Sequence, residues 1–313
     1  MAVPRSPLVL AALASAAVPG LVPVATRPTP VVGADYDTAV VTDTQNRSWI
    51  VRAPRTAAAG ASLESELTLL RGLCTLGTGD LVGHRLPFVV PDPTRTVELP
   101  EGGRAMVYPY LVGSALHPGD LGPGPGVGAA LGAALAALHD VPQSVVEDAG
   151  LPSYSAEEYR ARRMVELDSA AGTGHVPARL LARWETALED VGRWRFQPAL
   201  VHGDLVAEHV LVHDGQVVGM LDWADAKVAD PADDLAWVAV GADEKALDSV
   251  LEAYCMARHE QPDRHLPHRA RLAGELALAR WLVHGVRQDD PEVVDDAVGM
   301  LQDLDADVGG ELL

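Results

Sequence analysis

The sequence predicts an α+β protein with a small, strand-rich N-terminal lobe and a larger, helical C-terminal lobe. Residues 31–54 alternate polar and apolar side chains and are rich in Val and Thr, as strands are. From residue 125 onward the apolar residues recur mainly at helical spacing, with one strand pair between residues 199 and 223. Together these patterns place most strands in the first lobe and most helices in the second.

The composition limits the class of protein. With 313 residues and 48% apolar side chains, the chain is long enough to bury the cores of two lobes. Its net charge of -20 argues against a nucleic acid or an anionic membrane as partner; it suits a cationic ligand, or only a solvated acidic surface. Cys74 and Cys255 form no CxxC motif, so neither a disulfide framework nor a zinc finger is expected. Lysine is nearly absent, with only Lys227 and Lys245.

The chain begins with an apolar stretch, "PLVLAALASAAVPG", that has two interpretations. An early Arg followed by apolar and small residues is typical of a secretory signal. The same run fits an amphipathic helix that starts near Pro7 and includes Leu8, Leu10 and Leu13. No apolar stretch reaches the length of a membrane span.

A hairpin and a helix are predicted next. The turn sequence "DTQN" interrupts the alternating residues 31–54, which indicates two antiparallel strands. In "ASLESELTLLRGL" the spacing changes, and Leu63, Leu67 and Leu70 form one apolar stripe of a helix.

Two further strand candidates complete the N-terminal lobe. They are residues 86–92, "LPFVVPD", and residues 103–113, "GRAMVYPYLVG". The end of the second, residues 108–113, reads as a connector, and a Gly/Pro-rich passage follows before an Ala-rich helix. We therefore divide the chain into a nucleotide-binding lobe, residues 1–108, and a catalytic and substrate-binding lobe, residues 109–313.

Residues 199–223, "ALVHGDLVAEHVLVHDGQVVGMLDW", gather the most unusual side chains. Two β-branched runs flank the Asp-Gly pair at 214–215, which favours a tight hairpin turn with positive φ. Because a hairpin returns its second strand to the level where its first began, His209 and Asp222 should lie near each other. Asp204, on the loop entering the hairpin, can reach the same place.

This spacing is the layout of kinase phosphoryl transfer. There, a loop Asp accepts the proton of the acceptor hydroxyl, and two later ligands hold a divalent metal against the phosphates. Asp204 is accordingly the catalytic candidate, and His209 and Asp222 are the metal candidates. The expected ion is Mg²⁺, bound through water at His209, or Mn²⁺ bound directly, because imidazole is a softer ligand than an oxygen. A pseudokinase with a decayed metal site is the alternative.

These motifs resemble the aminoglycoside phosphotransferase family of kinase-like enzymes. The family has "HGDxxxxN" and then "DW" or "DF"; this chain has "HGDLVAEH" and "LDWADAKVADPADDLAW". His209 stands where most of the family has Asn, which is similar to the macrolide phosphotransferase branch. The resemblance implies a protein-kinase-like two-lobed fold, transfer from GTP rather than ATP to the 2′-hydroxyl of a macrolide amino sugar, and antibiotic resistance. It also implies that His202 braces the loop of Asp204 and that Asp234 caps the amides of that loop.

Kinase-like folds pair a basic residue of the third strand with the nucleotide phosphates and with a Glu of the next helix. Residues 1–226 contain no Lys, so Arg52 in "WIVRAP" takes this place. Arg55 follows a proline and should lie beyond the strand. Glu66 lies nearer the apolar stripe than Glu64 and is the expected partner.

The rest of the nucleotide site is less distinctive. The single Gly33 supports no GxGxxG phosphate loop. Backbone groups of the connector should recognise the purine, through residues Tyr108, Pro109, Tyr110 and Leu111.

The acceptor site is predicted from charge and from one apolar helix. An acidic protein suits a large cationic macrolide. Trp281, beside Leu282 and Val286 in "ELALARWLVHGVRQ", is a candidate macrolide contact, although the same residues fit a plain core helix. The final residues form an acidic amphipathic helix.

The same residues also allow other functions. A related kinase could act on an aminoglycoside or a hydroxylated metabolite; the chain could be a nucleotide-binding module without turnover; or His202, Asp204, His209 and Asp222 could serve a metal-dependent hydrolase. Because a kinase needs cytosolic nucleotide, we expect a cytoplasmic protein and favour the helix over the signal at the N-terminus. We also expect a monomer. Neither nucleic acid nor membrane is an expected partner.

Overall fold

The structure is a computed structural model that describes residues 4–29, 35–78 and 85–308. The chain divides into two compact units. The first unit comprises Met1–His117, Pro142–Leu151 and Ala207–Ala226. The second comprises Pro118–Val141, Pro152–Val206 and Lys227–Leu313.

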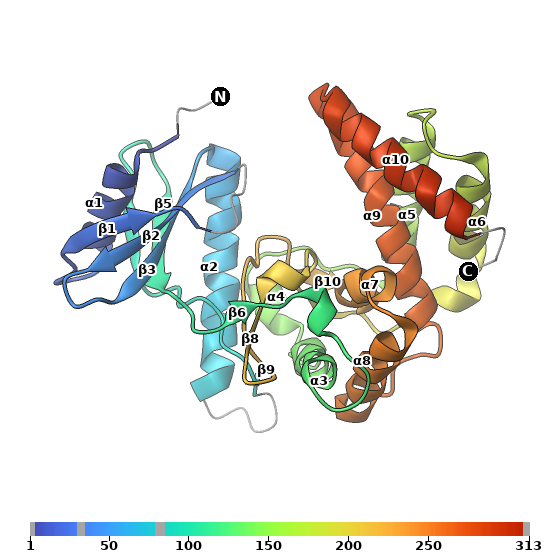
Figure 1. Ribbon diagram of the computed structural model, residues 1–313, viewed down its shortest axis with the longest axis horizontal. Coiled ribbons are helices and arrows are strands. Elements are labelled where there is room, and N and C mark those ends of the chain that lie inside the picture. The colour runs from blue at the N-terminus through green and yellow to red at the C-terminus, as the bar shows by residue number, and fades with distance from the viewer. Residues whose placement is uncertain (1–3, 30–34, 79–84, 309–313) are drawn as a thin grey trace. The chain divides into compact units, whose positions relative to one another are not determined.

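A five-stranded antiparallel sheet in the order β1-β2-β3-β5-β4 forms the body of the first unit (Figure 1). β2 and β3 are the hairpin predicted from residues 31–54. Its turn is closed by Asp43, whose carboxylate accepts hydrogen bonds from the amides of Gln45 and Arg47, both at 2.9 Å. The strands are β1 Pro23–Arg27, β2 Tyr36–Asp43, β3 Ser48–Pro54, β4 Thr96–Glu98 and β5 Arg104–Pro109.

Two helices of the first unit confirm the sequence prediction. α1 (Pro7–Ala17) starts with Ser6 as its N-cap and buries Leu10 and Ala14 in one apolar cluster with the sheet. α2 (Ala57–Thr78) buries the predicted leucine stripe completely, which stabilises the fold by about 1.5–3 kcal/mol for each leucine.

A second, three-stranded sheet in the first unit has the order β6-β8-β9. Its strands are β6 Ser114–Ala115, β8 Val210–His213 and β9 Gln216–Met220. A short helix, α4 (Ser144–Asp148), packs on α2, and a 3-10 turn, η3 (Ala207–His209), leads into β8.

The second unit is mainly helical, as predicted. Helices α3 and α8 approach so closely that a Cβ on Gly132 would lie 2.2 Å from the carbonyl oxygen of Val250, so only glycine fits there. The helices are α3 Val127–His139, α5 Ala156–Ala171, α6 Ala178–Glu189, α7 Ala232–Gly241, α8 Glu244–Ala257, α9 Leu266–Gln288 and α10 Pro291–Asp307. The remaining elements are η1 Pro118–Asp120, η2 Val191–Trp194 and the antiparallel pair β7 Ala199–Val201 and β10 Lys227–Ala229.

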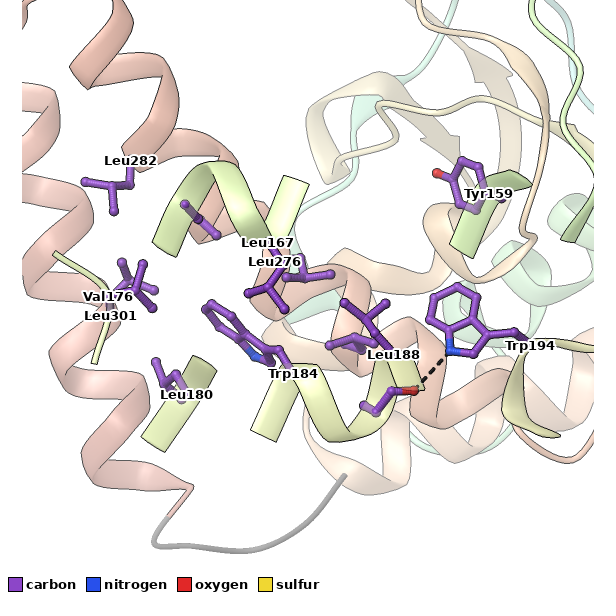
Figure 2. Close-up of a cluster of buried hydrophobic side chains, with 14 of the residues drawn as sticks. Tyr159, Leu167, Val176, Leu180, Trp184, Leu188, Trp194, Leu276, Leu282 and Leu301 are labelled. Atoms are coloured by element: carbon purple, nitrogen blue, oxygen red, sulfur yellow. Dashed lines mark hydrogen bonds between the residues drawn. The ribbon is translucent and has the colours of Figure 1, made fainter. Parts of the chain in front are cut away.

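The core of the second unit is built around two tryptophans (Figure 2). Trp184 is fully buried, and its indole N–H donates to Glu275 at 2.7 Å. The indole N–H of Trp194 donates to the carbonyl of Ala187 at 3.0 Å. The acidic tail helix, α10, packs on this core through Leu301, as its apolar spacing predicts.

One strand prediction is wrong. Residues 86–92 form no strand, because only Val89 pairs, in an isolated bridge with Gly219. β1 and the pair β7–β10 were not predicted: they are only three to five residues long, and pairing across the sequence defines them. None of the described helices is long and apolar enough to cross a bilayer.

Candidate active site

The β8–β9 hairpin brings His209 and Asp222 together. Asp214 and Gly215 have φ of 47° and 75°, the positive values expected for this tight turn. One step beyond the strands, the amide of Leu221 donates to the carbonyl of His209 at 2.9 Å. With this hydrogen bond in place, the imidazole Nε2 of His209 lies 4.0 Å from Oδ2 of Asp222. The hairpin therefore places an imidazole and a carboxylate at one end of a rigid ribbon.

Arg52 joins this pair from the five-stranded sheet. Its guanidinium donates to both carboxylate oxygens of Glu66 at 2.7 and 2.9 Å, and to Oδ1 of Asp222 at 2.8 Å. The ring of Tyr36 lies under the guanidinium, with 3.9 Å between the guanidinium carbon and the ring centroid. Asp222 itself has a φ of 61°, the left-handed conformation that an Asp tolerates better than most residues.

The residues that could have replaced Arg52 or Glu66 in this pair have other partners. Arg104, not Arg52, pairs with Glu64, at 2.8 and 2.9 Å. Arg55 lies beyond the end of β3 and pairs with Asp37 at 2.8 Å. Arg52 with Glu66 is thus the buried pair of this strand and helix.

Burial sets the charge states around Arg52. Although burial opposes its charge, the carboxylates of Glu66 and Asp222 raise the pKa of Arg52, so it stays a cation. Burial also raises the pKa of Tyr36 to about 12, so its hydroxyl stays protonated and donates to the carbonyl of Ala59 at 3.0 Å.

A cavity of about 370 Å³ in the first unit contains these groups. This size is within the range of small-molecule pockets. Arg52, His209 and Asp222 all line it. The full lining is Thr29, Tyr36, Thr38, Ile50, Arg52, Tyr108, Tyr110, Leu111, Gly113, Ser114, Ala115, Glu208, His209, Leu211, Leu221 and Asp222.

The connector contributes one side of this cavity. The amide of Tyr110 donates to the carbonyl of Ser48 at 2.9 Å, while the amide of Leu111 has no partner within the described part of the chain. Pro109 ends β5 opposite Trp49 and, unlike its neighbours Tyr108 and Tyr110, is not among the lining residues. Gly33 lies outside the described residues.

The loop of residues 202–206 belongs to the second unit and follows β7. The carboxylate of Asp234, at the start of α7, accepts hydrogen bonds from the amides of His202 at 2.8 Å and Gly203 at 2.9 Å. Asp204 lies on this anchored loop and is exposed, while His202 is completely buried. The predicted trio is thus divided between the units, with Asp204 in the second and His209 and Asp222 in the first.

Comparison with known proteins identifies the family. A profile of the phosphotransferase enzyme family (APH) matches residues 29–274. The chain belongs to this family. The sequence resemblance is therefore confirmed.

Solved structures show the same fold. A macrolide 2′-phosphotransferase type I is 27% identical with a TM-score of 0.74, and the match covers 94% of this chain and 96% of that one. The macrolide 2′-phosphotransferase MphH of Brachybacterium faecium is 24% identical with a TM-score of 0.76, over 94% and 97% of the two chains. The GDP complex of aminoglycoside 2′-phosphotransferase-IIIa is 18% identical with a TM-score of 0.76, over 97% and 99%. The predicted kinase-like α+β fold is thereby confirmed.

Within this phosphotransferase, the metal candidates are a two-residue set. Among residues 4–29, 35–78 and 85–308, no three His, Cys, Asp or Glu side chains are gathered as a metal site. His209 and Asp222 supply an imidazole nitrogen and a carboxylate oxygen, a donor set that suits a divalent cation whose other ligands are phosphate and water oxygens.

Trp281 lies in the helical unit of the phosphotransferase, on α9. It is 40% exposed, its ring stacks on His284, and its indole N–H donates to Asp296 at 3.2 Å. It is not a core residue of this helix.

Sequence reasoning missed the support behind Asp234. Nε2 of His139 lies 3.1 Å from Oδ2 of Asp234, and Nδ1 of His139 lies 2.8 Å from the hydroxyl of Tyr254. All three side chains are buried. A His at the end of an otherwise apolar helix was the available signal.

Proposed function

We propose that this phosphotransferase transfers the γ-phosphate of GTP, or of ATP, to the 2′-hydroxyl of a macrolide amino sugar, and so gives macrolide resistance in the cytoplasm. The observation that supports it most directly is the cavity whose wall contains Arg52, His209 and Asp222, with Asp222 beside both of the other two side chains. Kinase-like sites hold a metal–nucleotide complex with a basic residue for the phosphates and two ligands for the metal; Arg52 would be the first, and His209 and Asp222 would be the second.

The first unit would bind the nucleotide. Arg52, held in place by Glu66 and Asp222, would donate its remaining N–H groups to phosphate oxygens. The amide of Leu111, a residue that lines the cavity, would donate to a purine. His209 and Asp222 would hold Mg²⁺, or Mn²⁺, and the bound cation would offset charge on the phosphates.

The second unit would supply the group that receives the proton. Asp204 would orient the acceptor hydroxyl and accept its proton as the hydroxyl oxygen attacks the γ-phosphorus and the nucleoside diphosphate leaves. Its loop is held by Asp234, which in turn is supported by His139. This anchoring would keep the carboxylate in position for transfer.

The proposed acceptor rests on the net charge of the chain and on its similarity to macrolide phosphotransferases. A net charge of -20 suits the dimethylammonium group of a macrolide amino sugar. His209 at the position that is usually Asn, and 27% identity to a macrolide 2′-phosphotransferase type I, favour this substrate. Trp281, with its exposed indole on α9, is the proposed macrolide contact.

A second candidate is an aminoglycoside or a hydroxylated metabolite as the acceptor. The TM-score to an aminoglycoside 2′-phosphotransferase is 0.76, the same as the TM-score to the macrolide 2′-phosphotransferase MphH. The fold is therefore as compatible with an aminoglycoside acceptor as with a macrolide.

The deciding experiment supplies purified protein with erythromycin, kanamycin or choline, each with GTP or ATP and Mg²⁺. Mass spectrometry detects the addition of one phosphoryl group. We expect phosphorylated erythromycin, with GTP as the better donor. Phosphorylation of kanamycin alone would establish the second candidate instead.

The role of Asp204 is tested by Asp204→Ala. Because proton acceptance and positioning matter only in the chemical step, turnover should fall by about 10²–10⁴-fold while nucleotide affinity persists. Steady-state kinetics and calorimetric titration of nucleotide measure the two quantities. Asp303→Ala, an exposed change on α10, is the matched control. Near-normal turnover of Asp204→Ala would show that the assignment is wrong.

A further inference from the structure

One of the two lysines of the chain lies beside the loop of Asp204. The sequence holds 24 Lys and Arg residues, of which only Lys227 and Lys245 are lysines. Lys245 is exposed on α8. Lys227 is the first residue of β10, where it pairs with Val201, the residue that precedes the 202–206 loop. Its side chain is only 18% exposed.

Lys227 contacts the backbone of that loop. Its Nζ donates to the carbonyl oxygen of Gly203 at 3.4 Å and lies 4.0 Å from Oδ2 of Asp233. The amide of the same glycine donates to Asp234 at 2.9 Å. Two successive residues of α7 therefore hold Gly203, one at its N–H directly and one at its C=O through the lysine.

The carboxylate that holds Lys227 is itself fixed. Asp233 accepts a hydrogen bond from the guanidinium of Arg163 at 2.6 Å and another from the hydroxyl of Tyr159. Arg163 also donates to Glu166 at 2.7 Å. The side chains of Arg163 and Asp233 are each only 7% exposed. The ammonium group thus lies beside a carboxylate whose position Arg163 and Tyr159 fix.

The geometry points to Lys227 as a positioning residue for Asp204, an inference that rests on the proposed function. The carbonyl of Gly203 belongs to the peptide unit that joins Gly203 to Asp204. Gly203 has a φ of 84°, and a glycine, having no Cβ, restricts its own backbone less than any other residue does. One hydrogen bond at its amide leaves the next peptide unit able to rotate, and a second at its carbonyl fixes that unit. Lys227 therefore orients the backbone from which the catalytic carboxylate extends.

A lysine suits this task better than an arginine. An ammonium group is a compact charge with three donors that can serve a carbonyl and a carboxylate from different directions. A guanidinium presents a planar fork that fits a carboxylate edge, as Arg104 does with Glu64. Arginine at position 227 would keep the charge and reach the carbonyl with poorer geometry.

The test compares Lys227→Met, Lys227→Arg and the control Lys245→Met in the full chain, with GTP, Mg²⁺ and erythromycin. In Lys227→Met we expect kcat to fall about 100-fold, because a small displacement of the base is costly, while GTP affinity stays unchanged. Lys227→Arg should recover about tenfold of that loss. Lys245→Met should match the wild type. A wild-type kcat in Lys227→Met overturns the inference, and so does an equal loss of kcat and GTP affinity with no recovery in Lys227→Arg.

A second measurement is independent of turnover. Hydrogen–deuterium exchange of peptides that contain residues 200–206 should quicken in Lys227→Met and not in Lys245→Met. Unchanged exchange in Lys227→Met overturns the inference. If the wild type phosphorylates no acceptor, the proposed function fails, and the exchange result still decides whether Lys227 holds the loop.

Discussion

Two arginines, one in each unit, hold a pair of carboxylates in the same way. Arg52 of the first unit contacts Glu66 at 2.7 Å and Asp222 at 2.8 Å. Arg269 of the second unit contacts Asp230 at 2.6 Å and Asp263 at 2.9 Å.

Their surroundings separate them. Arg269 and Asp230 are each 2% exposed, and the guanidinium also donates to the carbonyl of Arg193 and lies over the ring of Phe196. Asp222 is 40% exposed and lines the cavity. A fully buried pair cannot change partners without a large desolvation penalty, whereas a pair open to a cavity can. We therefore propose that the Arg269 group serves stability and that the Arg52 group serves ligand binding.

The largest expected effect is on stability. Arg269→Met leaves Asp230 buried without its cation, which should lower the free energy of unfolding by roughly 3–5 kcal/mol. Urea denaturation followed by circular dichroism measures this.

Arg287→Met is the matched control, an exposed arginine of the same helix, and should change stability by less than about 0.5 kcal/mol. An equal loss of unfolding free energy in Arg269→Met and Arg287→Met would contradict the assignment of the Arg269 group to stability.

The next largest effect is expected on the turnover rate. Asp222→Asn removes a charge from the cavity while keeping the side-chain shape, so turnover should fall about 10²–10³-fold with little change in the unfolding temperature. Steady-state kinetics and calorimetric titration of GTP with and without Mg²⁺ measure it. Asp225→Asn, an exposed neighbour, is the control. A stability loss as large as that of Arg269→Met would place Asp222 with the structural group.

A smaller effect follows from Arg52→Lys. Lysine keeps the charge but lacks the fork that reaches Glu66 and Asp222 together and stacks on Tyr36, so the KM for nucleotide should rise about tenfold. Arg47→Lys, at the exposed β2–β3 turn, should leave it unchanged. An unaltered nucleotide KM in Arg52→Lys would mean that the guanidinium does not touch the phosphates.

Local patterns predicted the parts of the fold that depend on neighbouring residues. Alternation of polar and apolar residues predicted the β2–β3 hairpin, and the helical spacing of leucines predicted α2. The Asp214-Gly215 pair predicted the turn that brings His209 near Asp222. The pairing of Arg52 with Glu66 followed from the kinase-like arrangement of a basic strand residue and a Glu of the next helix, and from the position of Glu66 near the leucine stripe.

Contacts across long stretches of chain were not predictable in this way. Arg52 and Asp222 are 170 residues apart, and His139 and Asp234 are 95 apart. Neither contact leaves a periodic signal, because each depends on how whole elements pack. Residues 86–92 show the opposite error: a β-branched run was read as a strand, but only Val89 finds a strand partner.

Asp234 differs from the carboxylates of both groups, because backbone amides and a histidine hold it instead of an arginine. Burial alone would raise the pKa of Asp234, but the hydrogen bonds from His139 and the amide of Gly203 outweigh burial and lower it below the usual 3.8. An acid whose pKa is lower in the folded state stabilises the fold fully above pH 3.8 and loses that contribution as the pH falls through its folded-state pKa. The urea midpoint should therefore fall more steeply below pH 3.8 in the wild type than in Asp234→Asn, which carries no titrating group there, while Asp303→Asn should follow the wild type. Identical slopes for the wild type and Asp234→Asn would mean that the carboxylate of Asp234 contributes nothing to holding the 202–206 loop as an anion.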